Sequence, residues 1–133
     1  MESPIAVRWL EDSTAIIMAR IEDRPTAPNS RGTALLRANL SAITYWVYDV
    51  TTEGSEAVVS GHNGVSLTIS DVIFDTLQGW HVDGVGHNFR KTLAATAFPT
   101  GGNKYRVEVK WTHTDGRIGF TRWEGPADKI YSS

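Results

Sequence analysis

The sequence contains no cysteine, and this absence excludes several kinds of site at once. Without thiols the chain forms no disulfide, no cysteine nucleophile and no cysteine-ligated zinc centre, so packing alone has to stabilise the fold. A strong charge bias is also missing, because 13 basic and 15 acidic residues leave a formal charge of -2. Proteins that bind nucleic acid or anionic membranes usually carry a basic footprint, and we therefore expect neither partner here.

Long apolar runs are absent as well. No stretch approaches the roughly 18 apolar residues of a membrane-spanning helix. The first residues, "MESPIAVRWL", carry an acid where a secretory signal peptide has a basic region. We expect a protein made in the cytoplasm, with no signal peptide and no transmembrane segment.

Motifs of common catalytic and nucleotide-binding sites are also missing. The stretch "GVGHNF" lacks the third glycine of a dinucleotide-binding loop, and "GGNK" lacks the spacing of a phosphate loop. No Gly-x-Ser-x-Gly nucleophile elbow occurs in the chain. We expect a protein that is not an enzyme and binds no cofactor.

Glycine and tryptophan, by contrast, are abundant, with 12 glycines and 5 tryptophans. Bulky aromatic residues between frequent turn residues suit short strands better than long helices. The length suits one domain over residues 1–133, built around one hydrophobic core.

Alternation of apolar and polar residues predicts strands at several places. Residues 13–22, "STAIIMARIE", are β-branched and apolar on both parities and are expected to form a core strand, and residues 105–111, "YRVEVKW", are expected to turn one face toward the core and the other toward water. The run "AITYWVYDV", residues 42–50, is the most strand-like, and it carries large side chains on both faces. Residues 57–70 are expected to form two short strands around a turn at "GHNG".

Three other segments are less regular. Residues 23–32 contain two prolines among small polar residues and are expected to form an exposed connection. Residues 34–40 are compatible with a strand or a helical turn. In residues 71–79, a helical turn capped at Ser70 or Asp71 and ending at Gly79 is favoured over a strand.

The dipeptide Asp115-Gly116 is a strong signal for a hairpin with a two-residue type I′ turn. That register would pair Trp111 with Phe120 and His113 with Ile118 on one face. It would place Trp123 on the opposite face. Six or more short strands without regular helices predict an all-β, antiparallel immunoglobulin-like β-sandwich with at most one short helical turn, and a small β-barrel is the second possibility.

The stretch "GWHVDGVGHNF" concentrates His81, Asp83 and His87 among three glycines. This spacing matches neither a helical zinc motif nor a calcium loop, so we expect no metal site. The simpler interpretation is a loop whose glycines permit positive φ and whose ends are anchored by Trp80 and Phe89. In that loop His81, Asp83 and His87 are predicted to be contact residues.

Aromatic side chains are the better candidates for binding. Trp46 and Tyr48 lie on the second face of their strand, and the predicted hairpin register adds Trp123. Such aromatics can stack on sugar rings or anchor a protein interface. In the alternative, a loop or a terminal strand covers them, because large aromatics are mostly buried in small domains.

Three segments carry a resemblance to known proteins: "IEDRPTAPNSRGTALLRANLSAITYWVYDV", "VSLTISDVIFDTL" and "YRVEVKWTHTDGRIGFTRWEGP". Their layout resembles the small immunoglobulin-like modules in structural proteins of tailed bacteriophages, and is similar to the N-terminal domain of phage baseplate upper proteins over most of residues 14 to 125. The resemblance implies a non-enzymatic virion component, for example a head decoration, head-tail connector, tail or baseplate protein. Baseplate upper proteins usually continue into a long fibrous region, and this sequence ends at Ser133, which favours a stand-alone accessory protein.

We therefore expect a virion structural protein that docks onto other virion proteins, with repeated contacts of the kind found in symmetric oligomers. The alternative is a carbohydrate-binding β-sandwich module that uses exposed aromatics to hold a glycan. The predicted interface residues are Trp46, Tyr48, Trp123, His81, Asp83 and His87.

Overall fold

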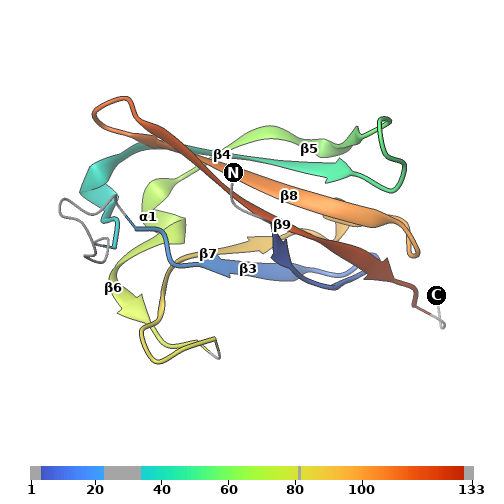
Figure 1. Cartoon of the computed structure of the whole chain (residues 1–133), viewed down its shortest axis with the longest axis horizontal. Helices are drawn as coiled ribbons and strands as arrows, with labels where there is room; N and C mark the ends of the chain where they lie inside the picture. The colour runs from blue at the N-terminus through green and yellow to red at the C-terminus, as the bar shows by residue number, and fades with distance from the viewer. Residues whose placement is uncertain (1–3, 23–33, 81, 131–133) are drawn as a thin grey trace.

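The computed structural model describes residues 4–22, 34–80 and 82–130, and its strands form two packed layers (Figure 1). The larger sheet has the strand order β1-β9-β8-β4-β5, with β2 also paired to β9, and the smaller sheet has the order β3-β7-β6. The strands are β1 (Ile5–Ala6), β2 (Trp9–Leu10), β3 (Ala15–Ala19), β4 (Leu40–Asp49), β5 (Ala57–Leu67), β6 (Ile73–Gln78), β7 (His87–Leu93), β8 (Lys104–His113) and β9 (Ile118–Asp128). They are connected by α1 (Ile69–Val72) and by the 3-10 turns η1 (Arg37–Asn39) and η2 (Ala95–Ala97).

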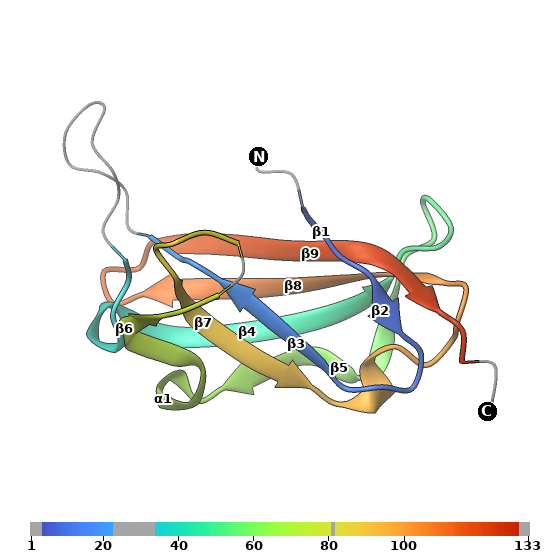
Figure 2. The same cartoon turned by 90° about the horizontal axis from the view of Figure 1, so that it is seen from below.

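This arrangement is a β-sandwich with immunoglobulin-like strand order. Strands β3, β7 and β6 take the places of B, E and D, and β9, β8, β4 and β5 take those of G, F, C and C′. Within the described residues, only β1 and β2 run parallel to their neighbour, β9. The predicted all-β sandwich is confirmed, and the barrel is not, because the strands divide into two separate sheets (Figure 2).

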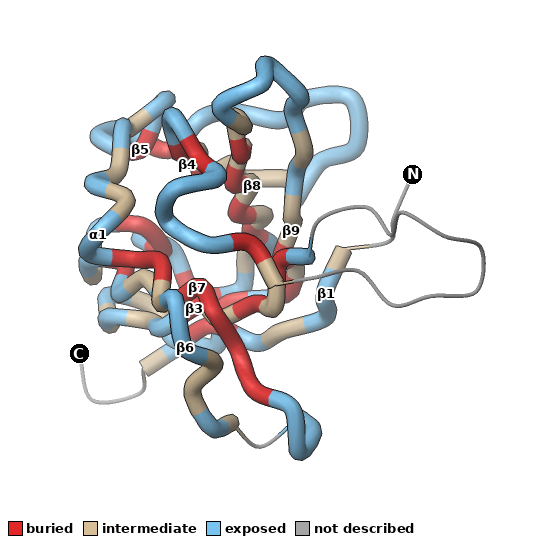
Figure 3. The backbone as a smooth tube through the Cα atoms, turned by 90° about the vertical axis from the view of Figure 1, so that its left-hand side faces the viewer, coloured by how far each residue is buried: buried red, intermediate tan, exposed pale blue. Residues whose placement is uncertain are grey.

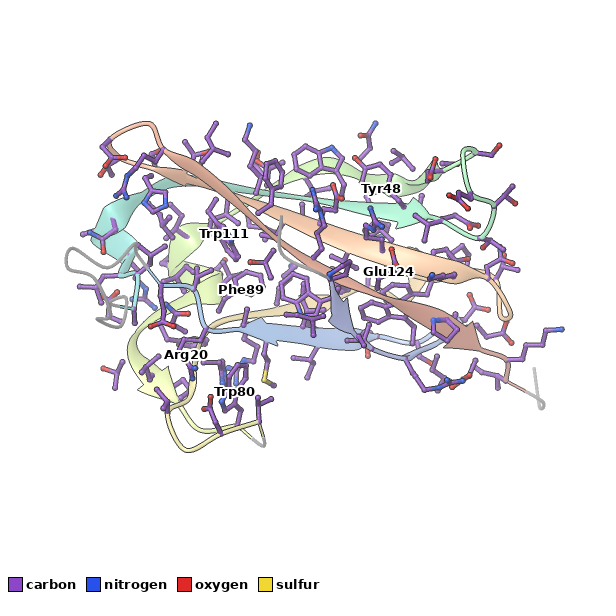
Figure 4. All side chains as sticks on the ribbon, in the orientation of Figure 1. Arg20, Tyr48, Trp80, Phe89, Trp111 and Glu124 are labelled. Carbon is purple, nitrogen blue, oxygen red and sulfur yellow. The ribbon has the colours of Figure 1, made fainter. Side chains whose placement is uncertain are left out.

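The core lies between the sheets, where the inward faces of the predicted strands meet (Figure 3). Ile17 of β3 and Ile43 of β4 are almost fully buried, and Val107 of β8 is fully buried on the face that alternation predicts. At the centre, Phe89 of β7 packs edge-on against Trp111 of β8 with ring centroids 4.9 Å apart (Figure 4). The ring of Trp123 lies 5.9 Å from the same phenylalanine. Each such side chain stabilises the fold by about 1.5–3 kcal/mol, so this aromatic cluster is a main source of stability.

Hydrogen bonds to Tyr105, at the start of β8, fasten one end of the sandwich. Its hydroxyl accepts a hydrogen bond from the Thr100 N–H at 3.0 Å and donates one to the Thr100 carbonyl at 3.4 Å. This is the tyrosine corner of immunoglobulin-type sandwiches. Trp9 of β2 stacks on Phe98 at 4.3 Å and donates its indole N–H to the Tyr105 carbonyl at 3.2 Å, which ties the N-terminal segment to the same corner.

The β8–β9 hairpin is shifted by one residue from the predicted register. Gly116 has a φ of 92° and donates its N–H to the His113 carbonyl at 3.0 Å. The loop is therefore a type I turn closed by a left-handed glycine, and not a two-residue type I′ turn. Trp111 does not pair with Phe120, nor His113 with Ile118, so both predicted pairs are wrong.

A one-residue shift transfers every side chain of a strand to the other face of its sheet. Trp123, predicted on the face opposite to Trp111, lies opposite Val107 in the core and is only 2% exposed. Phe120 and Ile118 are instead 47% and 56% exposed on the outside. The observed register buries the large indole of Trp123, and the free energy gained from that burial favours it over the predicted one.

Strand β5 corrects a second prediction, because one continuous strand replaces two strands around a turn at "GHNG". Gly61 and Gly64 have φ values of 85° and 69°, and the pairing with β4 shifts its register near Trp46. These glycines create bulges within the strand instead of ending it. His62, expected in a turn, is consequently only 5% exposed.

Residues 34–40 and 71–79, which the sequence did not assign clearly to helix or strand, each lie where a short helical turn meets extended chain. Residues 37–39 form η1, directly before β4. The helical turn favoured for residues 71–79 is present only as α1, which starts after Thr68 and ends at Val72, and β6 follows at once. The β-branched and aromatic residues after Val72 suit a strand, so the predicted helix end at Gly79 is wrong. The predicted connection over residues 23–32 lies outside the described residues.

The short strands β1 and β2 were not predicted from the sequence. They follow one register along β9, and the interruption between them falls at Val7, opposite Gly125. In a parallel ladder the Val7 carbonyl would accept from the residue after Gly125, but that residue is Pro126, which has no N–H. A Cβ on Gly125 would overlap the Val7 carbonyl, so only glycine permits this close approach.

Replacing Gly125 by alanine should push the N-terminal segment away from β9. We expect Gly125→Ala to lower the free energy of unfolding by about 1–3 kcal/mol, as overpacking commonly does. Gly79→Ala is the matched control, because a Cβ there would meet nothing within 4 Å. Chemical denaturation measures both, and equal stability of the two variants would contradict the close approach.

Candidate functional site

The outward face of the larger sheet gathers aromatic and charged side chains in rows across β4, β8 and β9. Trp46 stands beside Glu108, and Glu108 beside Arg122. In the next row Tyr48 stands beside Arg106, which is followed by Glu124. We call the six residues Trp46, Tyr48, Arg106, Glu108, Arg122 and Glu124 the outer face.

Ion pairs fix the charged part of the outer face. The Nε of Arg106 donates to Glu124 at 2.7 Å, and the Nε of Arg122 donates to Glu108 at 3.0 Å. A longer contact of 3.7 Å joins Arg106 to Glu108, and Lys104 reaches Glu124 at 3.2 Å. Cross-strand pairs of opposite charge contribute only about 0.2–1 kcal/mol each, so their main effect is to hold these side chains in place.

The carboxylate of Glu124 is kept ionised by this network. Partial burial raises its pKa, but the hydrogen bonds from Arg106 and Lys104 outweigh burial, and the pKa lies below its ordinary value. The outer face therefore presents fixed charges of both signs at neutral pH. With Lys104 and Lys110 on the same side of β8, cations outnumber carboxylates there.

The aromatic part of the outer face is half-buried and open to solvent. Trp46 packs over Gly64 of β5, whose missing side chain leaves room for the indole, since a Cβ there would lie 3.3 Å from its Nε1. Within the described residues, the indole N–H of Trp46 donates no hydrogen bond. Tyr48 is also half-buried, and burial together with the charge of Glu108 raises its pKa. Both rings can thus offer a face and a polar edge to a partner.

Trp123 is not part of this face. It was predicted as an interface residue, but it is buried in the core, where its indole N–H donates to the Met18 carbonyl at 3.3 Å. The shifted hairpin register explains the error. Phe120 occupies the outside in its place, and the guanidinium of Arg122 lies 5.9 Å from its ring centroid. Phe120 was not predicted at the surface, because the assumed turn placed it inside.

The loop between β6 and β7 is organised around Asp83. The carboxylate accepts hydrogen bonds from the Trp80 indole at 2.7 Å, from Arg20 at 2.8 Å, and from the backbone N–H groups of Val85 and Gly86 at 2.9 and 3.1 Å. The hydrogen bonds from Trp80 and Arg20 hold the pKa of Asp83 far below its ordinary value. Asp83 is therefore the internal anchor of the loop, and its role as a contact residue stays a prediction.

Other predictions for this loop are only partly met. Phe89 is fully buried as expected, while Trp80 is half-exposed and lies against Arg20 with 5.9 Å between guanidinium and ring (Figure 4). Of the three glycines in the stretch, only Gly86 has a positive φ, at 111°. His81 lies outside the described residues.

His87 is buried and cannot be the surface contact that the sequence predicted. It is 2% exposed, with its ring between Phe74 at 6.1 Å and Trp80 at 5.7 Å. Neither ring nitrogen has a hydrogen-bond partner among the described residues. Burial lowers the pKa of His87 and the charge of Arg90 lowers it further, which outweighs the raising effect of the nearby Gln78 backbone, so the imidazole is neutral at pH 7.

A second buried histidine, His62, joins two hydroxyl groups by hydrogen bonds, and the sequence did not predict this network. Its Nδ1 lies 2.8 Å from the Tyr45 hydroxyl and its Nε2 lies 3.0 Å from the Thr96 hydroxyl. A hydroxyl next to an imidazole is the geometry of an activated nucleophile. Here the third member is a neutral phenol, whose pKa burial raises, and a phenol cannot stabilise an imidazolium as a carboxylate does. The chain thus joins β4, β5 and η2 structurally.

Comparison with known proteins gives no relative: no family model, no curated protein and no solved structure matches this chain. In the part of the chain that the structure describes, no three histidine, aspartate or glutamate side chains form a metal-binding group, and no helix has the length and apolar character needed to cross a membrane.

The buried histidines predict a pH dependence of stability. Burial lowers the folded-state pKa of His62 and His87, so the unfolded chain binds more protons below about pH 6.5. The contribution of these histidines to the free energy of unfolding is therefore fully present above that pH. It falls on acidification, by up to about 1.4 kcal/mol per pH unit for each histidine.

We expect His87→Phe to reduce this slope between about pH 5 and 6.5, above the range in which most carboxylates titrate. His113→Gln is the control, at a half-buried position beside the hairpin turn. Urea unfolding at several pH values gives the slopes. A slope in His87→Phe as steep as in the parent protein would show that the buried imidazole does not cause the dependence.

Proposed function

We propose that this protein is a non-enzymatic docking protein that binds another protein through the outer face. The observation that carries the proposal is the juxtaposition of Trp46 and Tyr48, half-exposed on a regular sheet, with a fixed ladder of arginine and glutamate side chains. Tryptophan, tyrosine and arginine are the residues that most often dominate the energy of protein interfaces.

Preorganisation supports a binding role for the charged side chains. Binding costs about 0.5–1.5 kcal/mol for each long side chain that has to be ordered. Arg106 and Arg122 are already held by Glu124 and Glu108, so most of that cost has been met before a partner arrives. The surplus of cations on the outer face favours a partner surface that is apolar at its centre and acidic at its rim.

The partner we propose is another virion protein of a tailed bacteriophage, in a head decoration, head-tail connector, tail or baseplate. Support for this assignment is the resemblance of the sequence to immunoglobulin-like phage modules, together with the β-sandwich fold that the resemblance implies. A sandwich with a rigid outer face suits repeated docking on a symmetric particle, because one face can make the same contact at every copy.

A carbohydrate-binding module is the second candidate. One observation favours it: the indole of Trp46, whose N–H has no acceptor among the described residues, lies between two polar neighbours, Asn63 on β5 and Glu108 on β8. An aromatic ring flanked by polar groups is a suitable platform for a sugar ring.

A binding assay separates the two candidates. The proteins encoded by the genes next to this one are purified and tested by calorimetry against the parent protein, Trp46→Ala and Tyr48→Ala. We expect a capsid, portal or tail protein among them to bind, and Trp46→Ala to weaken that binding by about thirtyfold, the effect of a 2 kcal/mol hot spot.

Thr92→Ala is the matched control, since Thr92 is exposed on β7 of the smaller sheet, away from the outer face. A glycan array run with the same variants tests the second candidate. Saturable glycan binding that Trp46→Ala abolishes, without any protein partner, would replace docking by carbohydrate binding. Binding to a virion protein that both aromatic variants retain would show that the outer face is not the interface.

A further inference from the structure

A groove of about 490 Å³ lies at the edge of the sandwich between the β1–β2 segment and β3. Its walls are mostly apolar, with Ile5 and Leu10 on one side, Ile16 on the other, and Trp123 among the lining residues. Ile5, Leu10 and Ile16 are 43%, 48% and 57% exposed, although each is large and apolar. Exposed apolar side chains that line one groove indicate a binding surface.

Strand β3 presents an unpaired edge to this groove. In an antiparallel pair, alternate residues direct their N–H and C=O groups toward the partner strand and away from it. The Met18 carbonyl accepts from Trp123, so Met18 and Ile16 direct their backbone away from β7. Ile21 lies an odd number of residues from both and faces β7. Its N–H donates to the Asn88 side-chain oxygen at 2.7 Å, and its carbonyl accepts from the Asn88 side-chain nitrogen at 2.9 Å. The N–H and C=O of Ile16 and the N–H of Met18 thus form an open edge, while the Met18 carbonyl is already bonded to the Trp123 indole.

The β1–β2 segment shows the same property from the other side. The N–H groups of Val7 and Glu11 donate to β9 at 3.1 and 3.0 Å. Alternate residues of a strand direct their peptide groups to opposite sides. The N–H and C=O groups of Ala6, Arg8 and Leu10 therefore point away from β9. Figure 2 shows β3 with β7 along one of its edges and the β1–β2 segment across from the other.

The position beside β3 is the one that strand A occupies in a complete B-E-D sheet. Among the described residues no strand fills it, because the N-terminal segment pairs with β9 instead. We propose that this position receives an extended strand from another protein chain, by β-strand addition. The occupant would bond to the open edge of β3 and place alternate apolar side chains in the groove.

The chemistry of the groove selects this occupant over a small ligand or a folded surface. Unpaired peptide groups along a strand require another extended backbone to satisfy them. The nearby charges are already engaged, since Arg8 pairs with Asp128 at 2.6 Å and Arg20 with Asp83 at 2.8 Å. Specificity would therefore come from apolar residues at every second position of the incoming strand. This site is separate from the outer face, so each proposal can fail without the other.

The probe for this site is a soluble peptide of alternating valine and threonine with lysine at both ends, used with the full protein. The control peptide has the same sequence with the backbone amides on one edge N-methylated, which removes the donors and keeps the side chains. We expect saturable binding of the first peptide, with slower hydrogen exchange at the Ile16 and Met18 amides. The methylated peptide should bind at least about tenfold more weakly, the effect of losing one or two hydrogen bonds.

A pair of variants tests the same edge from the protein side. Ile16→Pro removes an N–H that faces the groove and leaves the pairing with β7 intact, while Ile16→Thr keeps the N–H and the β-branched shape. We expect Ile16→Pro to lose binding about tenfold more than Ile16→Thr. Should Ile16→Pro fail to fold, the two peptides on the parent protein still decide.

Equal binding of both peptides, or no binding at all, would overturn the proposal. So would binding that leaves the Ile16 and Met18 amides unprotected. Protection of these amides that grows with protein concentration in the absence of peptide would mean that a second copy of this chain occupies the edge, and the assignment to a different chain would then be wrong.

Discussion

The register between β8 and β9 is the constraint on which the rest of the structure depends. Gly116, in a left-handed conformation, closes a turn that sets each residue of β9 on one side of the larger sheet. Trp123 goes inside, where it contacts Phe89 and reaches the Met18 carbonyl across the gap between the sheets. Arg122 and Glu124 go outside and complete the ion pairs with β8. One turn thus determines the core, one wall of the groove and the charges of the outer face, because a strand cannot change faces residue by residue.

The two proposed surfaces differ in their physical character. The outer face is made of side chains on paired strands, so its backbone is satisfied and recognition has to come from rings and charges. The groove is made of strand edges, so recognition there begins with the backbone and adds apolar side chains. A protein that docks through the first and receives a strand at the second would link two neighbours in an assembly. Such a link needs no catalytic group, and none of the buried histidines is required for it.

The histidines show how strongly context governs these residues. His87 and His62 look like ligands or catalytic groups in the sequence, yet one is enclosed by Phe74 and Trp80 and the other bridges two hydroxyls. Burial keeps both neutral by lowering their pKa values. Their effect is therefore on the pH dependence of folding. Asp83, in contrast, is charged because Arg20 and the Trp80 indole compensate it, and it holds its loop together.

Three features could be predicted from local sequence alone: the all-β class, the inward face of β8 with Val107 and Val109, and the place of Trp46 and Tyr48 on the second face of β4. These features follow from the two-residue period of a strand, which is local. Long-range packing sets four other features: the register of Trp123, the continuity of β5 through its bulges, the burial of His87 and the open edge of β3. Each of these features depends on the difference in free energy between alternative folds of the whole chain. Those folds differ, for example, in which indole is buried and in which sheet the N-terminal segment joins. A local pattern contains no information on that comparison, because the competing partners are far apart in the chain.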